Sequence, residues 1–335
     1  MSDPVLPPLR YLGAADVRAA MPQLDARLAL AERVMVALAV PGAADLPPKI
    51  AVHPRPDESF AHAMPAHLRA DGDDAAADLV GVKWVAGFPA NIAAGVPSIS
   101  ALIVLNDPLT GIPVAVLDGG PVTAERTAAV SGVAIRRFAP GVAGRTARAA
   151  LIGAGVQGHS HVPVLGHVLP GVDLTLFDPD PERAAALADR ARATAGVGTA
   201  QAAGSAREAI EGADVVVTAA AFGPIRQVMT NDWLAAGALV VPIDYATYCS
   251  AEVARDAALF LVDHREQFLA NRDAGLFEGF PEPDATLGEA ILAGTPRPAG
   301  RVVVSHLGVG LADVVFGDAI VRAAEERGIG VLLPR

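Results

Sequence analysis

The stretch Leu151-Ile-Gly-Ala-Gly-Val-Gln-Gly158 decides the fold of this 335-residue chain. A short apolar run ends at Ile152, and Gly153, Gly155 and Gly158 then open a segment with apolar residues at helical spacing. In such a turn the first glycine permits a tight bend, the second lets the backbone approach a pyrophosphate, and the third lets the helix pack on the strand. The helix N-terminus also attracts the anion. We therefore predict a dinucleotide-binding turn.

A carboxylate follows the next apolar strand, where folds of this kind contact a ribose. The run 172–177 ends at Asp178, twenty residues after Gly158, and an acidic side chain there accepts hydrogen bonds from a ribose 2′-hydroxyl. The same charge repels a 2′-phosphate, so we predict NAD rather than NADP as the cofactor. The alternative interpretation is a glycine-rich loop followed by an ordinary turn aspartate in the segment 178–181.

Composition and charge narrow the class of protein. The length fits two domains of about 150 residues each, and hydrophobic residues make up 52% of the chain. A net charge of −11 without a basic run argues against a nucleic-acid or anionic-membrane partner. A single cysteine, Cys249, excludes an internal disulfide, and the scattered histidines lack metal-ligand spacing. Because neither a signal peptide nor an unbroken apolar span is recognisable, we expect a soluble cytoplasmic protein without a metal.

Two patterns of secondary structure divide the chain. Segment 12–39 is predicted to form helix in two pieces divided near Pro22, and a helix with Thr123 as its N-cap is predicted over 123–138. Between them lie extended segments that predict an antiparallel or mixed sheet. These segments are 47–53, 60–66, 79–86, 99–105 and 113–117.

From Arg148 onward strands and helices alternate, which predicts a parallel sheet of the Rossmann type. The last segment, 309–327, is predicted to be an amphipathic helix that returns to the first domain, so that this domain is discontinuous. The expected strands are 148–152, 172–177, 196–201, 214–219, 238–243, 258–262 and 301–305.

A few polar residues stand in positions that could carry chemistry. Lys83 lies in a strand with two apolar faces, so its ammonium must either reach an edge or meet an anion. Arg126 could clamp a carboxylate or phosphate, or simply be a solvated helix arginine. Asp244 follows the apolar strand 238–243, where site residues of parallel sheets collect, although a capping role is an equal possibility. His62 and Lys49 lie in the extended segments, where isolated residues of these types are more often surface side chains.

A series of motifs resembles the ornithine cyclodeaminase and mu-crystallin family over nearly the whole chain. The resemblance implies a homodimer of α/β class, with a Rossmann NAD-binding domain at 126–311 and a discontinuous α+β substrate-binding and dimerisation domain at 1–125 and 312–335. The motifs are Met64-Pro65-Ala66, Gly81-Val-Lys-Trp-Val-Ala-Gly-Phe-Pro89, Pro97-Ser-Ile-Ser100, Leu105-Asn-Asp-Pro-Leu-Thr-Gly-Ile-Pro113, Thr123-Ala-Glu-Arg-Thr-Ala-Ala129, Gly153-Ala-Gly-Val-Gln157 and Leu307-Gly-Val-Gly-Leu-Ala-Asp313.

The resemblance also implies roles for individual residues. Lys83 and Arg126 would bind the substrate carboxylate, together with Lys49, and Lys83 would polarise or protonate the substrate nitrogen. Asp244 or His62 would be the proton-transfer partner. The implied cofactor contacts are Gly153, Gly155, Val156, Gln157, Asp178, Thr218, Arg126 and His306.

The implied function is NAD(P)-dependent hydride transfer at the α-carbon of a small amino or imino acid, as an imine reductase or amino acid dehydrogenase. One alternative is an ornithine cyclodeaminase that forms L-proline and ammonia, and another is a non-catalytic NAD(P)H- and ligand-binding protein like mu-crystallin. The sequence departs from the cyclodeaminase pattern at His62, where that enzyme has a glutamate, and at Lys49, which replaces an arginine. An ungapped match also places Ala246, and not Asp244, at the position of its aspartate.

Overall fold

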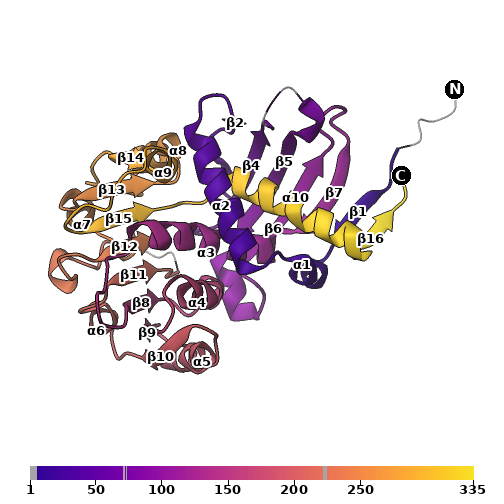
Figure 1. The fold of residues 1–335 in the computed structure, drawn as a ribbon. Coiled ribbons are helices and arrows are strands. Elements are labelled where there is room, and N and C mark those ends of the chain that lie inside the picture. Colours follow the sequence, from indigo (N-terminus) through magenta and orange to yellow (C-terminus); the bar gives the residue numbers. More distant parts are fainter. Residues whose placement is uncertain (1–5, 71, 73, 222–224) are drawn as a thin grey trace, which may run out of the picture. The chain divides into compact units, whose positions relative to one another are not determined.

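The structure, a computed structural model, describes residues 6–70, 72, 74–221 and 225–335. By its internal contacts the chain divides into two compact units, which are Met1–Arg126 with Val309–Arg335, and Thr127–Gly308. The elements of both units are labelled in Figure 1. That the first unit binds substrate and mediates dimerisation, and that the second binds the dinucleotide, stay predictions.

The first unit is built on a mixed sheet whose described strands follow the order β16-β1-β7-β6-β5-β4-β2, with β3 pairing on β4. Strands β3 to β7 pair antiparallel, whereas β1 lies parallel to β7. The predicted mixed sheet is therefore confirmed. The strands are β1 (Leu9–Leu12), β2 (Ala44–Asp45), β3 (Ile50–Val52), β4 (Phe60–Leu68), β5 (Leu79–Gly87), β6 (Ile99–Asn106), β7 (Pro113–Asp118) and β16 (Val331–Leu333).

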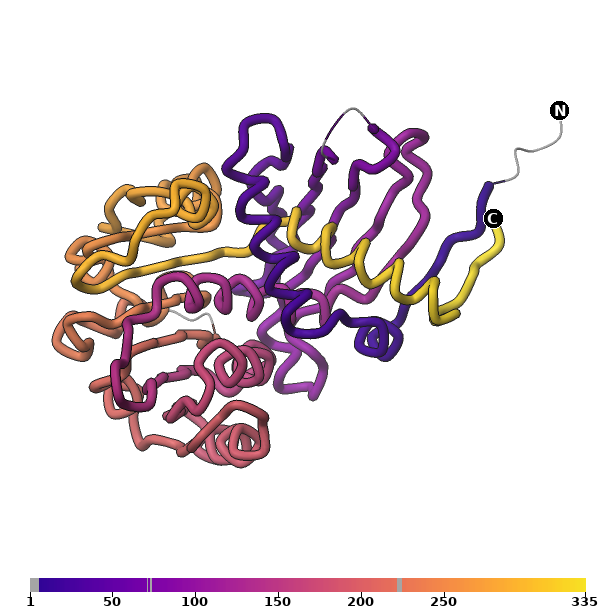
Figure 2. The backbone as a smooth tube through the Cα atoms, in the orientation of Figure 1, coloured from indigo at the N-terminus to yellow at the C-terminus, as the bar shows by residue number. Residues whose placement is uncertain are grey.

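One face of this sheet is covered by the last helix of the chain, α10 (Gly310–Arg327), which contacts β4, β5 and β6. Figure 2 shows this yellow helix beside the indigo helix α2 (Leu24–Ala39), although the two are far apart in the sequence. The segment 310–317 is buried on every side, so the predicted amphipathic pattern holds only for the second half of α10. The remaining helices of the unit are α1 (Ala14–Ala20), η1 (Ala75–Ala77) and η2 (Pro89–Ala94).

Helix α3 (Gly119–Phe138) runs from the first unit into the second. The prediction that Thr123 caps its N-terminus was wrong, because the helix begins one turn earlier. The carboxylate of Asp118 accepts a hydrogen bond from the backbone N–H of Gly120 at 2.9 Å, and it satisfies an amide that would otherwise lack a partner at this end. Two consecutive glycines concealed this start, since glycine is a poor helix former.

The described strands of the second unit form a parallel sheet in the order β10-β9-β8-β11-β12-β15-β13-β14. The first strand of the unit, β8, thus lies between β9 and β11, which creates a switch point in strand order at the glycine turn. The predicted parallel sheet is confirmed. The strands are β8 (Arg148–Ile152), β9 (Val172–Phe177), β10 (Val197–Ala202), β11 (Val215–Thr218), β12 (Leu239–Pro242), β13 (Leu259–Val262), β14 (Ala285–Thr286) and β15 (Val302–Ser305).

Helices connect most of these strands, but the alternation is not strict. Between β11 and β12 the described residues contain only the short turn η3 (Asn231–Trp233), so the prediction of a helix between every pair of strands was wrong at this place. The helices are α4 (Val156–Val168), α5 (Pro181–Arg192), α6 (Ala206–Ile210), α7 (Ala251–Arg255), α8 (Arg265–Asp273) and α9 (Leu287–Leu292).

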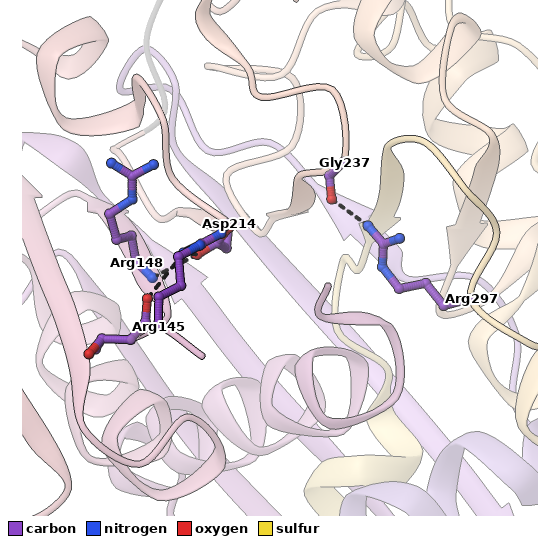
Figure 3. Close-up of polar contacts among 6 residues, drawn as sticks. Arg145, Arg148, Asp214, Gly237 and Arg297 are labelled. Atoms are coloured by element: carbon purple, nitrogen blue, oxygen red, sulfur yellow. Dashed lines mark hydrogen bonds and ion pairs between the residues drawn. The ribbon is translucent and has the colours of Figure 1, made fainter. Parts of the chain in front are cut away.

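Polar contacts hold the amino ends of the central strands, as Figure 3 shows. Asp214 receives two hydrogen bonds from the guanidinium of Arg145, at 2.7 and 2.6 Å, and one from the backbone N–H of Arg148 at 2.9 Å. Arg297 similarly donates to the carbonyl oxygen of Gly237. A cavity of about 320 Å³ opens nearby, lined in part by Arg148 and Asp173, and it includes none of the predicted site residues.

Among the described residues, no helix has both the length and the apolar character that crossing a membrane requires.

Candidate functional site

The turn between β8 and α4 needs glycine at two positions for steric reasons. Gly153 has φ +106°, and a Cβ placed on it would lie 2.4 Å from the carbonyl oxygen of Ala219. A Cβ on Gly158 would lie 2.1 Å from the carbonyl oxygen of Gly153. Both distances are far inside van der Waals contact, so only glycine lets the turn bend and the helix pack against the strand.

Gly155 differs from its neighbours because its missing side chain leaves space. A Cβ there would meet only the Nη2 atom of Arg183, at an ordinary distance of 3.6 Å. Gly155 is also the N-cap of the 13-residue helix α4, and Val156, the first residue of that helix, is 70% exposed. An open backbone surface at a helix N-terminus, next to a guanidinium, is what a bound pyrophosphate requires. The residues present therefore fit a dinucleotide.

Asp178 is buried at the end of β9, beside the glycine turn. Its Oδ2 accepts a hydrogen bond from the backbone N–H of Ala154 at 2.7 Å, and its Oδ1 accepts one from Asp180 N–H at 3.0 Å. The carboxylate thus holds the turn in place, and each oxygen has a second lone pair with which to accept a further donor. Asp178 therefore has a structural role that the sequence did not indicate, and its contact with a ribose stays a prediction.

Thr218 and Asp244 meet at the carboxyl end of β11 and β12. The Thr218 hydroxyl donates to Asp244 Oδ1 at 2.9 Å, and the backbone N–H of Ala220 donates to Oδ2 at 3.2 Å. Asp244 is 1% exposed, and its burial raises its pKa to about 7, although these hydrogen bonds oppose the shift. A carboxyl group with its pKa raised in this way is able to exchange a proton near neutral pH.

His306 follows β15 and is also buried. Its Nε2 lies 2.9 Å from the hydroxyl oxygen of Ser131 on α3, and that oxygen lies 2.8 Å from Nε2 of His161 on α4. His161 Nδ1 lies 2.7 Å from the carbonyl oxygen of Gln157. Burial lowers the pKa of His161 to about 4, so its ring is neutral at pH 7. The predicted cofactor residues Gln157 and His306 are thus connected through two residues that the sequence analysis did not single out.

In the first unit, one buried carboxylate binds two cationic side chains. Asp313 on α10 is fully buried; its Oδ2 lies 2.6 Å from Lys83 Nζ and its Oδ1 lies 3.2 Å from Arg126 Nε. The pKa of Lys83 is lowered to about 7, mainly by burial; the negative charge of Asp313 opposes this shift and the positive charge of Arg126 adds to it. With two cations and one anion, the centre favours a second carboxylate from outside the protein.

His62 lies on the same side of the sheet as Lys83, and Lys49, directly before β3, is near enough for its charge to act on both. Strand pairing sets His62 opposite Val85 and Lys83 opposite Met64, and side chains two residues apart share a face. Burial, together with the positive charges of Lys49, His53 and Lys83, lowers the pKa of His62 to about 4. Its neutral ring stacks on Phe60 at a centroid distance of 4.5 Å. This face therefore concentrates positive charge around Lys83.

The structure thus gathers the predicted residues into two groups, one in each unit. Lys49, Lys83, Arg126 and the neutral His62 belong to the first unit, and the glycine turn, Asp178, Thr218, Asp244 and His306 lie at the carboxyl edge of the second. Four further residues were not foreseen: Asp313, Arg183, Ser131 and His161. For Asp313 a signal existed, because an aspartate stands alone in the otherwise apolar run 309–317.

Comparisons with known proteins match parts of both units. Residues 16–283 match the model of the ornithine cyclodeaminase/mu-crystallin family. Nodulation efficiency protein NfeD of Rhizobium meliloti is 34% identical over 299 residues, covering 87% of this chain and 88% of that protein. Ketimine reductase mu-crystallin of Mus musculus is 29% identical and covers 78% of this chain and 79% of its own length.

Among solved structures, Δ1-pyrroline-2-carboxylate reductase of Thermococcus litoralis, in complex with NADH and L-proline, superposes with a TM-score of 0.82. It is 25% identical, and the match covers 96% of this chain and 99% of that structure. The likeness therefore extends over both units of the fold.

Proposed function

This chain belongs to the ornithine cyclodeaminase/mu-crystallin family, and from that premise we propose that it is an NAD-dependent oxidoreductase that reduces small α-imino acids or oxidises the corresponding amino acids. The observation that carries the proposal is the buried Lys83–Asp313–Arg126 centre, which has one more cation than anion. The reductases named among its relatives and structural neighbours support it.

The proposed division of labour follows from the residues of each unit. Arg126 and Lys83 bind the substrate carboxylate, and Lys83, with a pKa of about 7, is able to give a proton to the imine nitrogen. The glycine turn and Asp178 hold NADH, which supplies a hydride to the α-carbon when bound. In total one hydride and one proton add across the C=N bond, and an amino acid results.

The cationic face also favours a reductase over a cyclodeaminase. Cyclisation of ornithine needs a base that takes a proton from the distal amine, and that amine enters as a cation. In the described strands β3–β7, no carboxylate alternates onto the face of Lys83, where His62 lies instead and the charge of Lys49 acts. The positive charge of Lys49 repels the distal ammonium, and the neutral His62 ring offers it no opposite charge, so this face is poorly suited to ornithine.

The function is tested by offering the purified chain NADH with Δ1-pyrroline-2-carboxylate, Δ1-piperideine-2-carboxylate, or pyruvate with ammonia. We expect NADH oxidation with at least one of them. A parallel reaction holds L-ornithine with a catalytic amount of NAD. Proline and ammonia formed there without net change in NADH would identify a cyclodeaminase, and the absence of hydride transfer to any imine would favour a ligand-binding protein.

The choice of dinucleotide is tested by Asp178→Ala. We expect the ratio of kcat/KM with NADH to that with NADPH to fall by about tenfold or more, because the charge that repels a 2′-phosphate is removed. The affinity for both dinucleotides is expected to fall as well, since Asp178 holds the Ala154 amide in the turn. Asp180→Ala is the control, because Asp180 caps α5 nearby. An unchanged ratio in Asp178→Ala would mean that the carboxylate does not face the ribose.

We further propose that two chains associate through the outer face of the first unit's sheet. Strand register aligns Ile50, Ala63, Trp84 and Leu102 in one row across β3–β6. Ile50, Trp84 and Leu102 are 55%, 49% and 45% exposed. A contiguous apolar row of this kind marks a protein contact, and two copies of the same chain can bury the same row against each other about a twofold axis.

Trp84→Glu is expected to convert the dimer into single chains of 34.1 kDa, because a charge would be desolvated at the centre of the contact. Light scattering coupled to size-exclusion chromatography measures the mass. Leu109→Glu is the matched control, since Leu109 is 65% exposed but lies in the loop between β6 and β7. A wild-type chain that elutes as a monomer, or a Trp84→Glu dimer, would contradict the proposed interface.

A further inference from the structure

The cavity of about 320 Å³ in the second unit lies at the amino ends of β8 and β9, whereas the glycine turn follows the carboxyl end of β8. Parallel sheets are usually covered by helices on both faces. Here α6 has only five residues and packs on β8 and β9, while Thr199 and Gln201 of the neighbouring strand β10 stay exposed. The short helix thus leaves a hollow, and its volume falls within the range of about 300–1,000 Å³ that small-molecule sites occupy.

Two opposite charges face this cavity from directly paired strand positions. Arg148 is paired with Asp173, and Asp173 with Thr199, in the register of β8, β9 and β10, so the three side chains share one face of the sheet. Within the described part of the chain, however, the guanidinium of Arg148 forms neither an ion pair nor a hydrogen bond. Asp173 Oδ1 accepts a hydrogen bond from the Thr199 hydroxyl at 2.8 Å instead. The two charges are therefore neighbours that do not neutralise each other.

A glycine explains where the Arg148 guanidinium lies. A Cβ placed on Gly212 would lie 3.0 Å from Nη2 and 3.3 Å from Nη1 of Arg148, and Gly212 has φ +76°. The guanidinium thus occupies space next to the backbone that a side chain at this position would take. Asp214, two residues later, is bound by Arg145, and no dashed line in Figure 3 reaches the Arg148 guanidinium. Its N–H donors are therefore open to a ligand.

The charges around the cavity define the chemistry of that ligand. A guanidinium binds a carboxylate, and the carboxylate of Asp173 binds an ammonium group, so a small molecule with both groups would bridge them. Glu208 and Glu211 also line the cavity. Three carboxylates against one guanidinium disfavour a phosphate or a second acidic group, and they favour an additional cation. Among the described residues, no group of acidic, histidine or cysteine side chains is arranged to hold a metal ion, so an organic cation is the better match.

We propose that this cavity is a separate binding site for a free α-amino acid, and that it prefers one with a basic side chain. Arg148 binds the α-carboxylate, Asp173 binds the α-ammonium group, and Glu208 with Glu211 attracts the cation of the side chain. The inference goes beyond the proposed function, because the residues of the glycine turn and the Lys83 centre take no part in it.

The first test is isothermal titration calorimetry with the Lys83→Ala chain, in which the proposed substrate site is disabled. L-Lysine is expected to bind about tenfold more tightly than L-alanine, and L-aspartate more weakly than either. Cadaverine has the two amines of L-lysine without its carboxylate, and we expect it to bind at least about tenfold more weakly than L-lysine, because it cannot use Arg148. Equal affinities of cadaverine and L-lysine would mean that the cavity only attracts cations.

The second test changes the two charges one at a time in the same chain. Arg148→Gln and Asp173→Asn are each expected to weaken L-lysine by about tenfold or more. Asp173→Asn keeps an oxygen that can accept from the Thr199 hydroxyl, so the sheet is expected to stay intact. Arg190→Gln is the matched control, because Arg190 is an exposed arginine of α5 and does not line the cavity. It is expected to bind L-lysine like its parent, and all variants are expected to bind NADH equally.

The outcomes separate this site from the proposed function. The inference is overturned by the absence of L-lysine binding, or by unchanged affinity in either Arg148→Gln or Asp173→Asn. It also fails if L-lysine binds the wild-type chain but not Lys83→Ala, since binding then belongs to the substrate site. If L-lysine binds as expected and no imine is reduced with NADH, the proposed function fails and the amino acid site stands.

Discussion

Lys83→Ala is expected to lower kcat/KM for imine reduction by about a thousandfold or more, because it removes both a carboxylate ligand and the proton donor. The affinity for NADH is expected to stay within about threefold of wild type, since Lys83 belongs to the first unit and the glycine turn to the second. Stopped-flow reduction and fluorescence titration measure the two quantities. Weak NADH binding with intact chemistry would contradict the role given to Lys83.

The pH profile distinguishes Lys83 from Asp244, since both have a pKa of about 7. Lysine is charged below its pKa, so proton donation by Lys83 predicts that kcat/KM for imine reduction falls as the pH rises above about 7. Asp244→Asn imitates the protonated carboxyl group and is expected to leave this fall in place. If the fall disappears in Asp244→Asn, Asp244 is the proton donor and Lys83 only binds.

Asp313→Asn is expected to lower the free energy of unfolding by about 3–5 kcal/mol, which is the usual cost of leaving a buried charge without its partner. The amide keeps the volume of the carboxyl group, so the change isolates the charge. Arg126 cannot lose its proton to relieve the cost, whereas Lys83 can. Urea unfolding measures the effect, and NADH binding by the folded fraction shows whether the second unit is intact.

Asp318→Asn is the control on the same helix. Asp318 pairs with Arg322 at the surface, one turn apart, at 2.9 Å, and such pairs contribute only about 0.3–0.5 kcal/mol. Equal losses in the two variants would mean that α10 tolerates the missing charge at Asp313. The buried centre would then be held by packing and not by its ion pairs.

Most of the strands could be predicted because each is a short apolar or alternating run that ends at polar, glycine or proline residues. The glycine turn was predictable because Gly153, Gly155 and Gly158 stand close together in the sequence directly after β8, although the backbone that excludes a side chain at Gly153 belongs to Ala219. The start of α3 was missed because its capping carboxylate, Asp118, belongs to the preceding strand in the sequence pattern. Local capping of this kind depends on φ and ψ values that composition does not determine.

The candidate site was predictable only in part. Lys83 and Arg126 stood out as polar residues in apolar surroundings, but the residue that neutralises them lies 187 positions after Arg126. No spacing rule connects residues at such a distance, because the fold alone brings α10 to β5. Ser131 was missed for a different reason. A serine within a helix is common, and only its hydrogen bonds to the rings of His161 and His306 distinguish it from other serines.

The return of α10 to the first unit also determines when that unit can be completed. During synthesis from the N-terminus, Lys83 and Arg126 leave the ribosome long before Asp313 exists, and their charges must remain hydrated until it arrives. The segment 127–308 emerges in one piece and can fold before the last helix is made. The second unit can therefore be completed first on the nascent chain, and a chain truncated before residue 309 would hold that unit beside an unfinished sheet.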